Sequence, residues 1–330
     1  MATIRDVAQR AGVSAGTVSN VLNRPSYVSR EARERVQLAM RELDFTPSEH
    51  ARQYRRGRVR SIGIVMATMD YPFFVDVALH AEEAARADGV AVVFCHSGYD
   101  EAREDSNIDL LMQQRAQGVI ITPVDENSER LESMMARGVP VVFVDRVSGD
   151  RNCCSVVTDD IKGGELAAHH LLARGHRHVA FVGDPDMNRQ VSERLQGFSD
   201  VVTASGGIVD VIRVPDWAAA DGLAAGERLS AEPMKTRPTA VFGVNDLVAL
   251  GLMQRLTTNG VSVPDDVAVV GFDDLDLSSM STIPLTTVRQ PTEDLGRIAY
   301  RLLMDEINNP EGHRHERVVL PPQLVVRAST

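Results

Sequence analysis

Apolar positions in the first 45 residues recur at helical spacing in three short segments. Val7 and Ala8 give the first segment a close-packing apolar face, and Val18 and Val21 give the second segment a matching one. Gly12, four residues after Ala8, provides a turn position at which a side chain would be costly. This spacing predicts two short helices that cross at a tight turn, as in a helix-turn-helix DNA-binding unit.

The residues left outside this apolar contact define one exposed face of the second helix, formed by Ala15, Gly16, Ser19, Asn20 and Asn23. An ordinary helical hairpin would also account for an Ala-x-x-x-Gly turn, but it would not require the rest of the spacing. We therefore expect this face to meet DNA.

Residues 29–45 predict a third amphipathic helix, which Ser29 caps and Pro47 follows. The next segment, residues 48–58, is short and basic, so a helix formed there alone would be marginal in water. A segment that folds against DNA and a plain linker both fit this composition.

The charge of the chain changes sign near residue 60. Residues 1–60 contain 12 arginines, no lysine and 6 acidic residues, whereas the remaining 270 residues carry a net charge of −17 within the −11 of the whole chain. A basic first part suits contact with phosphates, and an acidic remainder keeps the rest of the molecule soluble and off the DNA.

From residue 61 onward, short apolar runs alternate with amphipathic helical segments such as residues 73–88 and 101–114. Continuous apolar strands between helices are typical of parallel sheets that are covered on both faces. The rhythm restarts at residue 178, so we expect an α/β core with two similar lobes. The predicted strands are residues 61–67, 90–95, 118–122, 139–144, 178–183, 208–214, 239–243 and 267–271.

Polar residues follow several of these predicted strands. Ligands of such sheets bind at the carboxyl ends of the strands, which makes these residues candidates for a binding site. For any one of them, a helix cap or a strand-end turn is the commoner role, and only their convergence on one face favours a site. They are Thr122, Asp145, Arg146, Asp184, Asn245, Asp246, Asp273 and Asp274.

Length and composition allow one small domain beside a larger one of two lobes, since the chain has 330 residues and is 43% hydrophobic. No stretch has the length and apolarity of a membrane span and no signal peptide opens the chain, so we expect a cytoplasmic protein. Cys95, Cys153 and Cys154 form no even disulfide framework, and we expect reduced thiols.

Other chemistries find little support in the sequence. His169, His170, His176 and His178 invite a metal hypothesis, but the first two are helix neighbours that point apart, so no metal site is expected. No Gly-x-Ser-x-Gly, Walker-type or His-Glu-x-x-His spacing occurs, and we expect neither an enzyme nor a cofactor. An exported sugar-binding protein could have a similar two-lobed core, but it would carry an export signal and would not begin with a basic DNA-binding segment.

The chain resembles the lactose-repressor (LacI) family over essentially its full length. In the first part, the resemblance is carried by Ile4-Arg5-Asp6-Val7-Ala8, Ala11-Gly12-Val13-Ser14, Thr17-Val18-Ser19 and Val21-Leu22-Asn23. In the core, it is carried by Gly175-His176-Arg177, Pro238-Thr239-Ala240-Val241, Asn245-Asp246, Gly271-Phe272-Asp273-Asp274 and Leu285-Thr286-Thr287-Val288.

This resemblance implies a helix-turn-helix head (residues 1–46), a hinge helix or linker (47–60) and a core (61–330) similar to periplasmic sugar-binding proteins. The first lobe would cover about residues 61–159 and 290–318, and the second about residues 160–289 and 319–330. Family members are usually dimers that bind near-palindromic operators and change their DNA affinity when a small molecule closes the lobes.

The resemblance also assigns DNA contacts. Ala15, Gly16 and Asn20 occupy base-reading positions, of which only Asn20 can form a bidentate pair, with adenine. The positions that contact phosphates or anchor helices are Thr3, Ser14, Thr17, Ser19, Asn23, Tyr27 and Ser29.

In the hinge, the minor-groove positions are Ala51, Arg52, Tyr54 and Arg55. Most members place a leucine wedge where this chain has Tyr54, and such a wedge parts a base step and kinks the duplex. Tyrosine is bulkier than leucine and carries a hydroxyl. The sequence therefore leaves open how such a wedge would be placed and which base step at the centre of the operator it would prefer.

In the core, the resemblance to the ribose-binding branch is close. A sugar needs carboxylates to accept from its hydroxyls, donors from arginine and amides, and flat apolar faces, which Phe73 and Phe74 could supply as a sandwich. Tyr71 replaces the asparagine usual in ribose binders, so ribose itself stays open. The expected effector-binding residues are Tyr71, Phe73, Phe74, Thr122, Asp145, Arg146, Arg194, Trp217, Asn245, Asp273 and Gln290.

We expect a repressor of carbohydrate-utilisation genes that a small sugar releases from a palindromic operator. A purine-type corepressor and a protein partner remain alternatives as effectors. The chain ends without the leucine heptad that makes some relatives tetramers, and we expect a homodimer.

Overall fold

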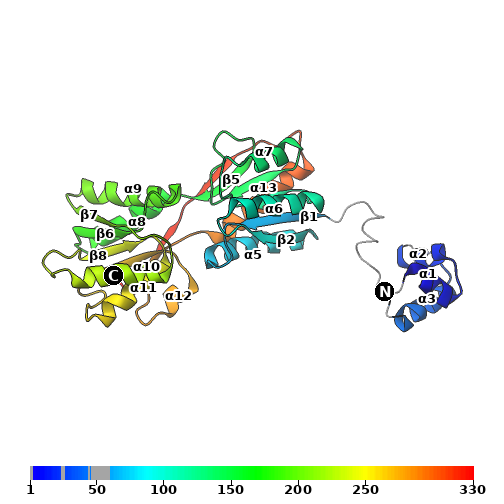
Figure 1. Ribbon diagram of the computed structural model, residues 1–330, viewed down its shortest axis with the longest axis horizontal. Helices are drawn as coiled ribbons and strands as arrows, with labels where there is room; N and C mark the ends of the chain where they lie inside the picture. Colours follow the sequence, from blue (N-terminus) through cyan, green and yellow to red (C-terminus); the bar gives the residue numbers. More distant parts are fainter. Residues whose placement is uncertain (1–2, 24–26, 44, 46–59) are drawn as a thin grey trace. The chain divides into compact units, whose positions relative to one another are not determined.

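The structure is a computed structural model that describes residues 3–23, 27–43, 45 and 60–330 (Figure 1). The chain divides into two units, Met1–Arg60 and Ser61–Thr330, and each is described here by itself. The expected hinge positions Ala51, Arg52, Tyr54 and Arg55 lie outside the described residues.

Three helices pack around one small apolar core in the first unit. Val7, Val18 and Val36 come from the three helices in turn, and each is fully buried. The pattern of apolar positions thus predicted all three helices. They are α1 (Ile4–Ala11), α2 (Ala15–Asn23) and α3 (Arg30–Glu42).

The turn after α1 depends on Gly12. Its φ of +62° and ψ of +41° lie in the left-handed region, where its N–H bonds the carbonyls of Ala8 and Gln9. No described atom lies within 4 Å of the place where a Cβ would stand, so the backbone conformation, rather than lack of space, favours glycine here.

The third helix is shorter than the sequence predicts. The side chain of Ser29 caps it as expected, but α3 ends at Glu42 instead of Phe45. The N–H of Phe45 bonds the carbonyl of Met40 at 2.9 Å, a bond that turns the chain back and packs the Phe45 ring against the head core. Burial of this ring accounts for the early end of the helix.

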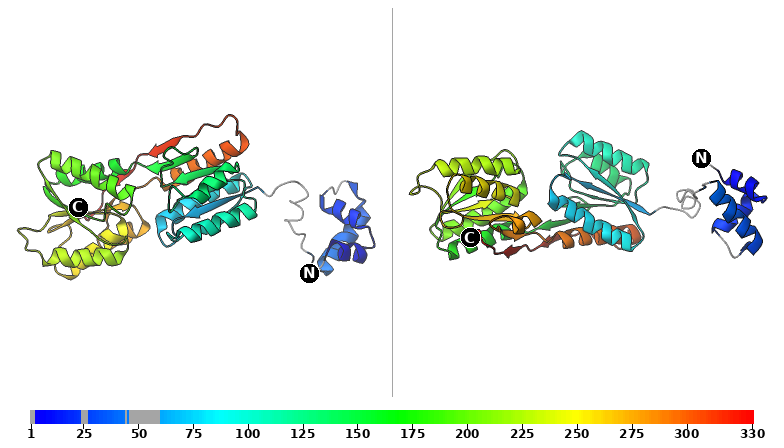
Figure 2. Two further views of the ribbon diagram at one scale, coloured as in Figure 1. Left: turned by 45° about the horizontal axis from the view of Figure 1, so that its top comes forward. Right: turned by 90° about the horizontal axis from the view of Figure 1, so that it is seen from below.

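The second unit contains two sheets, as the two series of apolar runs predict (Figure 2). The first sheet has the order β11-β5-β4-β3-β1-β2, and all its pairs are parallel. Its strands are β1 (Ser61–Met66), β2 (Ala91–His96), β3 (Val119–Ile121), β4 (Val141–Val144), β5 (Cys154–Thr158) and β11 (Arg317–Leu320).

The second sheet has the order β12-β10-β9-β8-β6-β7. It is parallel except at its edge, where β12 runs antiparallel to β10. Its strands are β6 (His178–Val182), β7 (Ile208–Ile212), β8 (Ala240–Gly243), β9 (Ala268–Asp273), β10 (Thr286–Arg289) and β12 (Gln323–Val325).

Helices cover both faces of each sheet, which is why the strands read as continuous apolar runs. The first lobe carries α5 (Pro72–Ala87), α6 (Glu101–Gln113), α7 (Glu129–Ala136) and α13 (Thr292–Asn308). The second carries α8 (Asp160–Ala173), α9 (Arg189–Ala204), α10 (Ala219–Ala231), α11 (Asp246–Thr258) and α12 (Asp276–Met280). Of the helices described, none has the length and apolarity needed to cross a membrane.

The chain crosses between the lobes after β5, after β10 and after β11. β11 ends at Leu320, two residues beyond the limit expected for the first lobe, and β12 then joins the second sheet. The crossings bring the carboxyl ends of both sheets toward one cleft.

Candidate ligand-binding cleft and nucleic-acid face

A cleft between the two lobes gathers most of the expected effector-binding residues. It encloses an empty volume of about 410 Å³, a figure that includes open solvent at its mouth. Nine expected residues line it: Tyr71, Phe73, Phe74, Asp145, Arg194, Trp217, Asn245, Asp273 and Gln290.

The wall from the first lobe is aromatic. Tyr71 precedes α5, and Phe73 and Phe74 lie in its first turn. The two phenylalanine rings meet edge to face, with centroids 5.1 Å apart and planes at 71°, and both are almost fully buried. They form an apolar corner instead of the expected sandwich.

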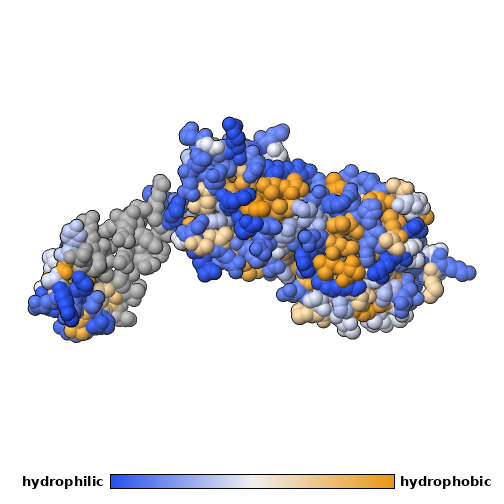
Figure 3. Space-filling model, turned by 180° about the vertical axis from the view of Figure 1, so that it is seen from behind, coloured by the Kyte–Doolittle hydropathy of each residue, from blue (hydrophilic) through white to orange (hydrophobic). Residues whose placement is uncertain are grey.

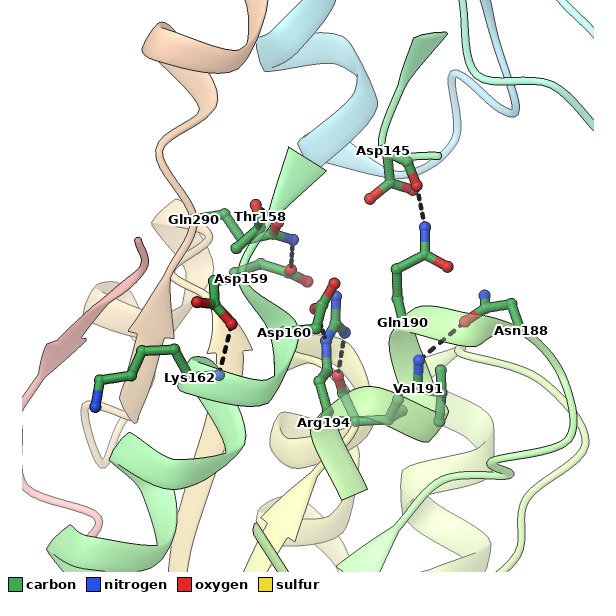
Figure 4. A network of polar contacts seen from close by, with 12 residues as sticks. Asp145, Thr158, Asp159, Asp160, Lys162, Asn188, Gln190, Val191, Arg194 and Gln290 are labelled. Atoms are coloured by element: carbon green, nitrogen blue, oxygen red, sulfur yellow. Dashed lines mark hydrogen bonds and ion pairs between the residues drawn. The ribbon is translucent and has the colours of Figure 1, made fainter. Parts of the chain in front are cut away.

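Arg194 supplies the positive charge of the cleft and is held rigidly (Figure 4). Its Nε donates to the carboxylate of Asp160 at 2.7 Å, and one Nη donates to the Val244 carbonyl at 2.8 Å. Its guanidinium carbon lies 3.6 Å from the centroid of the Phe272 ring. Burial raises the pKa of Asp160 to about 7, and the adjacent Arg194 opposes that rise.

Asp273 is the acidic centre of the second lobe. Its backbone φ is +114°, an unusual value for a residue with a side chain, and such strain is often found at binding sites. Its carboxylate accepts from the Tyr71 hydroxyl and from Nε2 of Gln290, the latter at 2.6 Å, and Gln290 in turn accepts from Thr158 at 2.6 Å. Burial raises the pKa of Asp273 to about 6, against the opposing effect of Arg194.

Several cleft residues also join the two lobes directly. The Tyr71 hydroxyl reaches from the first lobe to Asp273, and Nε2 of Gln190 reaches from α9 to the Asp145 carbonyl (Figure 4). At the rim, the rings of Tyr99 and Trp217 meet edge to face, with centroids 5.7 Å apart. Tyr71, Asp273, Asp145, Gln190 and Trp217 therefore line the cleft and also take part in contacts between the lobes.

Two expected residues do not line the cleft. Thr122 is fully buried, and its hydroxyl contacts the sulfur of Met66 at 3.7 Å, because at the end of β3 its side chain points into the core of the first lobe. Arg146 pairs with Asp145 at 2.6 Å and lies in a neighbouring hollow with Glu126. The structure thus removes Thr122 from the cleft and gives Arg146 a supporting position beside Asp145.

The other strand-end acids have the structural roles that such residues commonly take. Asp246 accepts from the N–H of Leu275 and from the hydroxyls of Ser278 and Thr287, at 2.8, 2.6 and 2.5 Å. Asp274 pairs with Arg289 and Arg327, and Asp184 pairs with Arg213.

Sequence reasoning missed four residues of the cleft lining, which are Asn188, Gln190, Val191 and Val244. The first three lie at the start of α9, after strand β6, where the strand-end rule could have located them. Among the described residues, Trp217 Nε1 and Gln190 Oε1 are buried without a hydrogen-bond partner. One is a donor and the other an acceptor, so the lining can still make both kinds of hydrogen bond.

The histidines that invited a metal hypothesis are used separately. His170 contacts the Thr330 hydroxyl, His176 contacts that of Thr239, and His178 contacts the Asp210 carboxylate. His169 is exposed.

In the head, the expected base-reading residues Ala15, Gly16 and Asn20 are all exposed on α2. Thr3 caps α1 in a reciprocal pair with Asp6, with hydrogen bonds of 3.3 and 2.7 Å.

The other expected backbone positions support these helices or project from them. Ser14 accepts from the Thr17 N–H at 3.0 Å, and Ser29 accepts from that of Ala32 at 3.3 Å. Ser19 is partly buried, and Tyr27 is 81% exposed. The side chain of Asn23 lies outside the described part of the chain.

Comparisons with known proteins agree with both units. A family model described as bacterial regulatory proteins, lacI family, matches residues 3–48, and a periplasmic binding protein-like domain matches residues 168–330. The chain is 33% identical to the ribose operon repressor of Escherichia coli over 332 residues, covering 100% of each chain. It is 32% identical to the transcriptional repressor PurR of Vibrio campbellii, covering 99% of this chain and 98% of that one.

Among solved structures, the chain is similar to a Lac repressor dimer bound to operator and the anti-inducer ONPF. The TM-score is 0.83 at 30% identity, and the match covers 100% of this chain and 99% of the other.

Proposed function

The chain belongs to the lacI family of bacterial regulatory proteins, and we propose that it is a transcriptional repressor that leaves its operator when a monosaccharide fills the cleft. The observation that carries the sugar assignment is the mixed lining of the cleft. Asp273 offers acceptor atoms, Trp217 offers a free donor, and Gln190 offers a free acceptor beside an aromatic corner. A polyol presents hydroxyls that both donate and accept, together with apolar C–H faces.

One relative supports this ligand class without fixing the sugar, because it is named a ribose operon repressor. Tyr71 stands where ribose binders usually carry asparagine, and its hydroxyl already donates to one carboxylate oxygen of Asp273. We therefore propose a monosaccharide whose hydroxyl pattern differs from that of ribose near Asp273.

A purine-type corepressor is the second candidate, because a PurR relative is almost equally similar and an aromatic wall also suits a flat base. The two candidates differ in sign, since a corepressor strengthens DNA binding and an inducer weakens it.

For the DNA contact, we propose a head of residues 1–46 and a hinge of residues 47–60. Asn20 would read adenine, while Ala15 and Gly16 would allow close approach to neighbouring bases. Thr3, Ser14, Thr17, Ser19, Asn23, Tyr27 and Ser29 would contact phosphates or hold the helices that do. Ala51, Arg52, Tyr54 and Arg55 would act in the minor groove.

A palindromic operator requires two heads, so we propose a homodimer. Apolar surface gathers in patches over both lobes of the core (Figure 3). On the second lobe, a groove between α11 and α12 is lined by Leu250, Met253, Leu277 and Met280, and Met280 is 70% exposed. Exposed apolar grooves of this kind are common at protein–protein interfaces.

Release follows from differential binding. A sugar that contacts both walls of the cleft binds closed lobes more tightly than open ones, so it shifts the population toward the closed form. If that form holds the heads less well on the operator, DNA affinity falls.

The experiment is a thermal-shift screen of the full chain against pentoses, hexoses, disaccharides, sugar phosphates, purines and nucleosides. A ligand that binds only the folded state raises the melting temperature. We expect a free monosaccharide to do so, to release the operator, and to lose both effects in Asp273→Ala, whereas Asp186→Ala, an exposed acid paired with Arg213, keeps them. A purine hit that tightens DNA binding would overturn the sugar proposal, and release of DNA by Asp273→Ala alone would overturn the assignment of the cleft.

A further inference from the structure

Three metal-ligating side chains from distant parts of the sequence meet at the beginning of β5. The Cys154 sulfur lies 3.3 Å from Nε2 of His313 and 4.0 Å from Nδ1 of His315. All three ligand atoms lie within 4.8 Å of one another. Thr158, at the other end of β5, bonds Gln290 of the cleft, so the cluster lies about 13 Å from the cleft end of this strand.

Glu306 completes the cluster from the last turns of α13. Its Oε2 lies 3.9 Å from Nε2 of His313 and 4.0 Å from Nδ1 of His315. This oxygen is buried and makes no hydrogen bond with any described residue. A buried carboxylate oxygen that faces two imidazoles, yet bonds neither of them, lacks the partner that an ion would supply.

The surroundings orient these groups as ligands. Nδ1 of His313 contacts the Asp305 carboxylate at 2.7 Å, which holds the proton on Nδ1 and leaves a lone pair on Nε2, the nitrogen that faces the sulfur. The N–H of Glu316 donates to the Cys154 sulfur at 3.4 Å. Carboxylate–histidine pairs and N–H bonds to sulfur are the usual outer-shell partners of metal ligands.

We propose that Cys154, His313, His315 and Glu306 form a four-ligand zinc site in the first lobe. Zn²⁺ takes sulfur, nitrogen and carboxylate ligands tetrahedrally, with Zn–S bonds of about 2.3 Å and Zn–N bonds of about 2.0 Å, which separate neighbouring ligand atoms by roughly 3.3–3.6 Å. The Cys154–His313 separation of 3.3 Å already matches. Glu306 lies 3.9 and 4.0 Å from the two imidazole nitrogens, and the ligand atoms of Cys154, His313 and His315 lie within 4.8 Å of one another, so the side chains would draw closer together around the ion. A thiolate among the ligands selects Zn²⁺ over Mg²⁺ or Ca²⁺.

The charges balance in this site. Binding displaces the thiol proton of Cys154 into solvent and leaves a thiolate, which together with the Glu306 carboxylate neutralises the two positive charges of the ion. The bonds would tie the end of α13 and the segment before β11 to β5, so the metal would stabilise the first lobe. The ligand set is closed, which is typical of structural sites.

The test is titration of the full chain with Co²⁺, a spectroscopic stand-in for Zn²⁺. We expect one equivalent to bind, with the intense visible bands of tetrahedral cobalt and a thiolate-to-cobalt charge-transfer band, and Zn²⁺ to displace it. Cys154→Ser should abolish the charge-transfer band and weaken binding by about tenfold or more. Cys153→Ser is the matched control. The Cys153 sulfur packs in the apolar core of the first lobe, so this substitution should leave the spectrum unchanged.

Glu306→Gln tests the fourth ligand in a variant that keeps the thiol. It should retain the charge-transfer band and bind Co²⁺ more weakly. His169 is exposed and lies outside the cluster, so His169→Gln should bind Co²⁺ as the unsubstituted protein does. The proposal is overturned if the folded protein, verified by circular dichroism, binds no equivalent of Co²⁺ or Zn²⁺ at micromolar concentrations. It is also overturned if Cys154→Ser binds with the same spectrum and affinity.

Discussion

At the scale of single residues, Asp273 and Tyr71 decide the chemistry of the cleft. Asp273 is held at a strained φ of +114°, faces Arg194, and accepts from the Tyr71 hydroxyl. Its pKa of about 6, against an ordinary 3.8, means that the folded protein keeps the proton of this carboxyl over a pH range in which an exposed aspartate has lost it. The ionised carboxylate is a stronger acceptor for a sugar hydroxyl than the protonated carboxyl group, so ligand binding and protonation of Asp273 compete.

We therefore expect sugar affinity to be constant above neutral pH and to fall as the pH is lowered through about 6, by up to about tenfold per pH unit. The Tyr71 hydroxyl lowers the pKa of Asp273 by hydrogen bonding to it. Tyr71→Phe removes that bond, so the pH at which affinity is half lost should move upward. Calorimetric titrations of both proteins from pH 5 to pH 8 measure it.

The control for this prediction is Asp273→Asn, which cannot ionise and should bind weakly at every pH in the range. An unchanged midpoint in Tyr71→Phe would show that the hydroxyl does not act on the carboxyl that binds the ligand.

At the scale of elements, paired glycines set how closely the helices of the second lobe approach. A Cβ on Gly164 of α8 would stand 2.1 Å from the Arg194 carbonyl oxygen, and one on Gly197 of α9 would stand 2.0 Å from that of Ile161. Such distances are impossible without backbone movement. The α8–α9 contact thus fixes the helix from which Arg194 enters the cleft.

Gly164→Ala should therefore lower the free energy of unfolding by about 1–3 kcal/mol and weaken sugar binding, because α9 must move and carry Arg194 away from Asp160. Gly226→Ala is the comparison, since its Cβ would meet Arg255 and Leu252 at 2.8 and 2.9 Å, at the end of the α10–α11 contact remote from Asn245. Denaturant-induced unfolding measures the loss of stability and ligand titration measures the loss of sugar affinity, so the two effects can be separated. Equal losses of affinity in both variants would mean that stability, and not the position of Arg194, limits binding.

The sequence predicted eight strands, most of them with continuous apolar runs, and it missed β5, β10, β11 and β12. β1, β4 and β8 lie in sheet interiors and are fully or almost fully buried, so their runs stand out. β10 (Thr286–Arg289) carries two buried threonines and an exposed arginine, and β12 is a three-residue edge strand, so neither produces such a run. Their pairing is set by tertiary contacts that no local pattern records.

The same limit applies to the candidate sites. Asp145, Asn245 and Asp273 could be located from sequence because the carboxyl ends of parallel strands meet at one edge. Thr122 could not be excluded, since one residue of register decides whether a strand-end side chain points into the core or into the cleft. Cys154 and His313 meet across 159 positions of sequence, a separation at which ligand spacing carries no signal.

At the scale of the whole molecule, the cleft is both the proposed ligand site and the contact between lobes. Tyr71 and Gln190 bridge the lobes through groups that a sugar would also engage. Trp217, the single tryptophan of the chain, lines the cleft and meets Tyr99 from the opposite lobe. Its fluorescence should therefore change when the ligand binds, which provides a direct measure of occupancy.

If the sugar and the operator act on one equilibrium between open and closed lobes, each must weaken the other by the same factor. We expect Trp217 titrations to give a sugar dissociation constant that rises about 5- to 150-fold when the protein is saturated with an operator selected from random DNA. Sugar should raise the operator dissociation constant by that same factor. Asn20→Ala, which removes the proposed adenine contact on the exposed face of α2, should bind sugar normally and lose the effect of DNA at the same DNA concentration. Linkage permits no one-way coupling between two binding equilibria. If a sugar released the operator while its affinity for the cleft did not change with bound DNA, the sugar would be acting at another site.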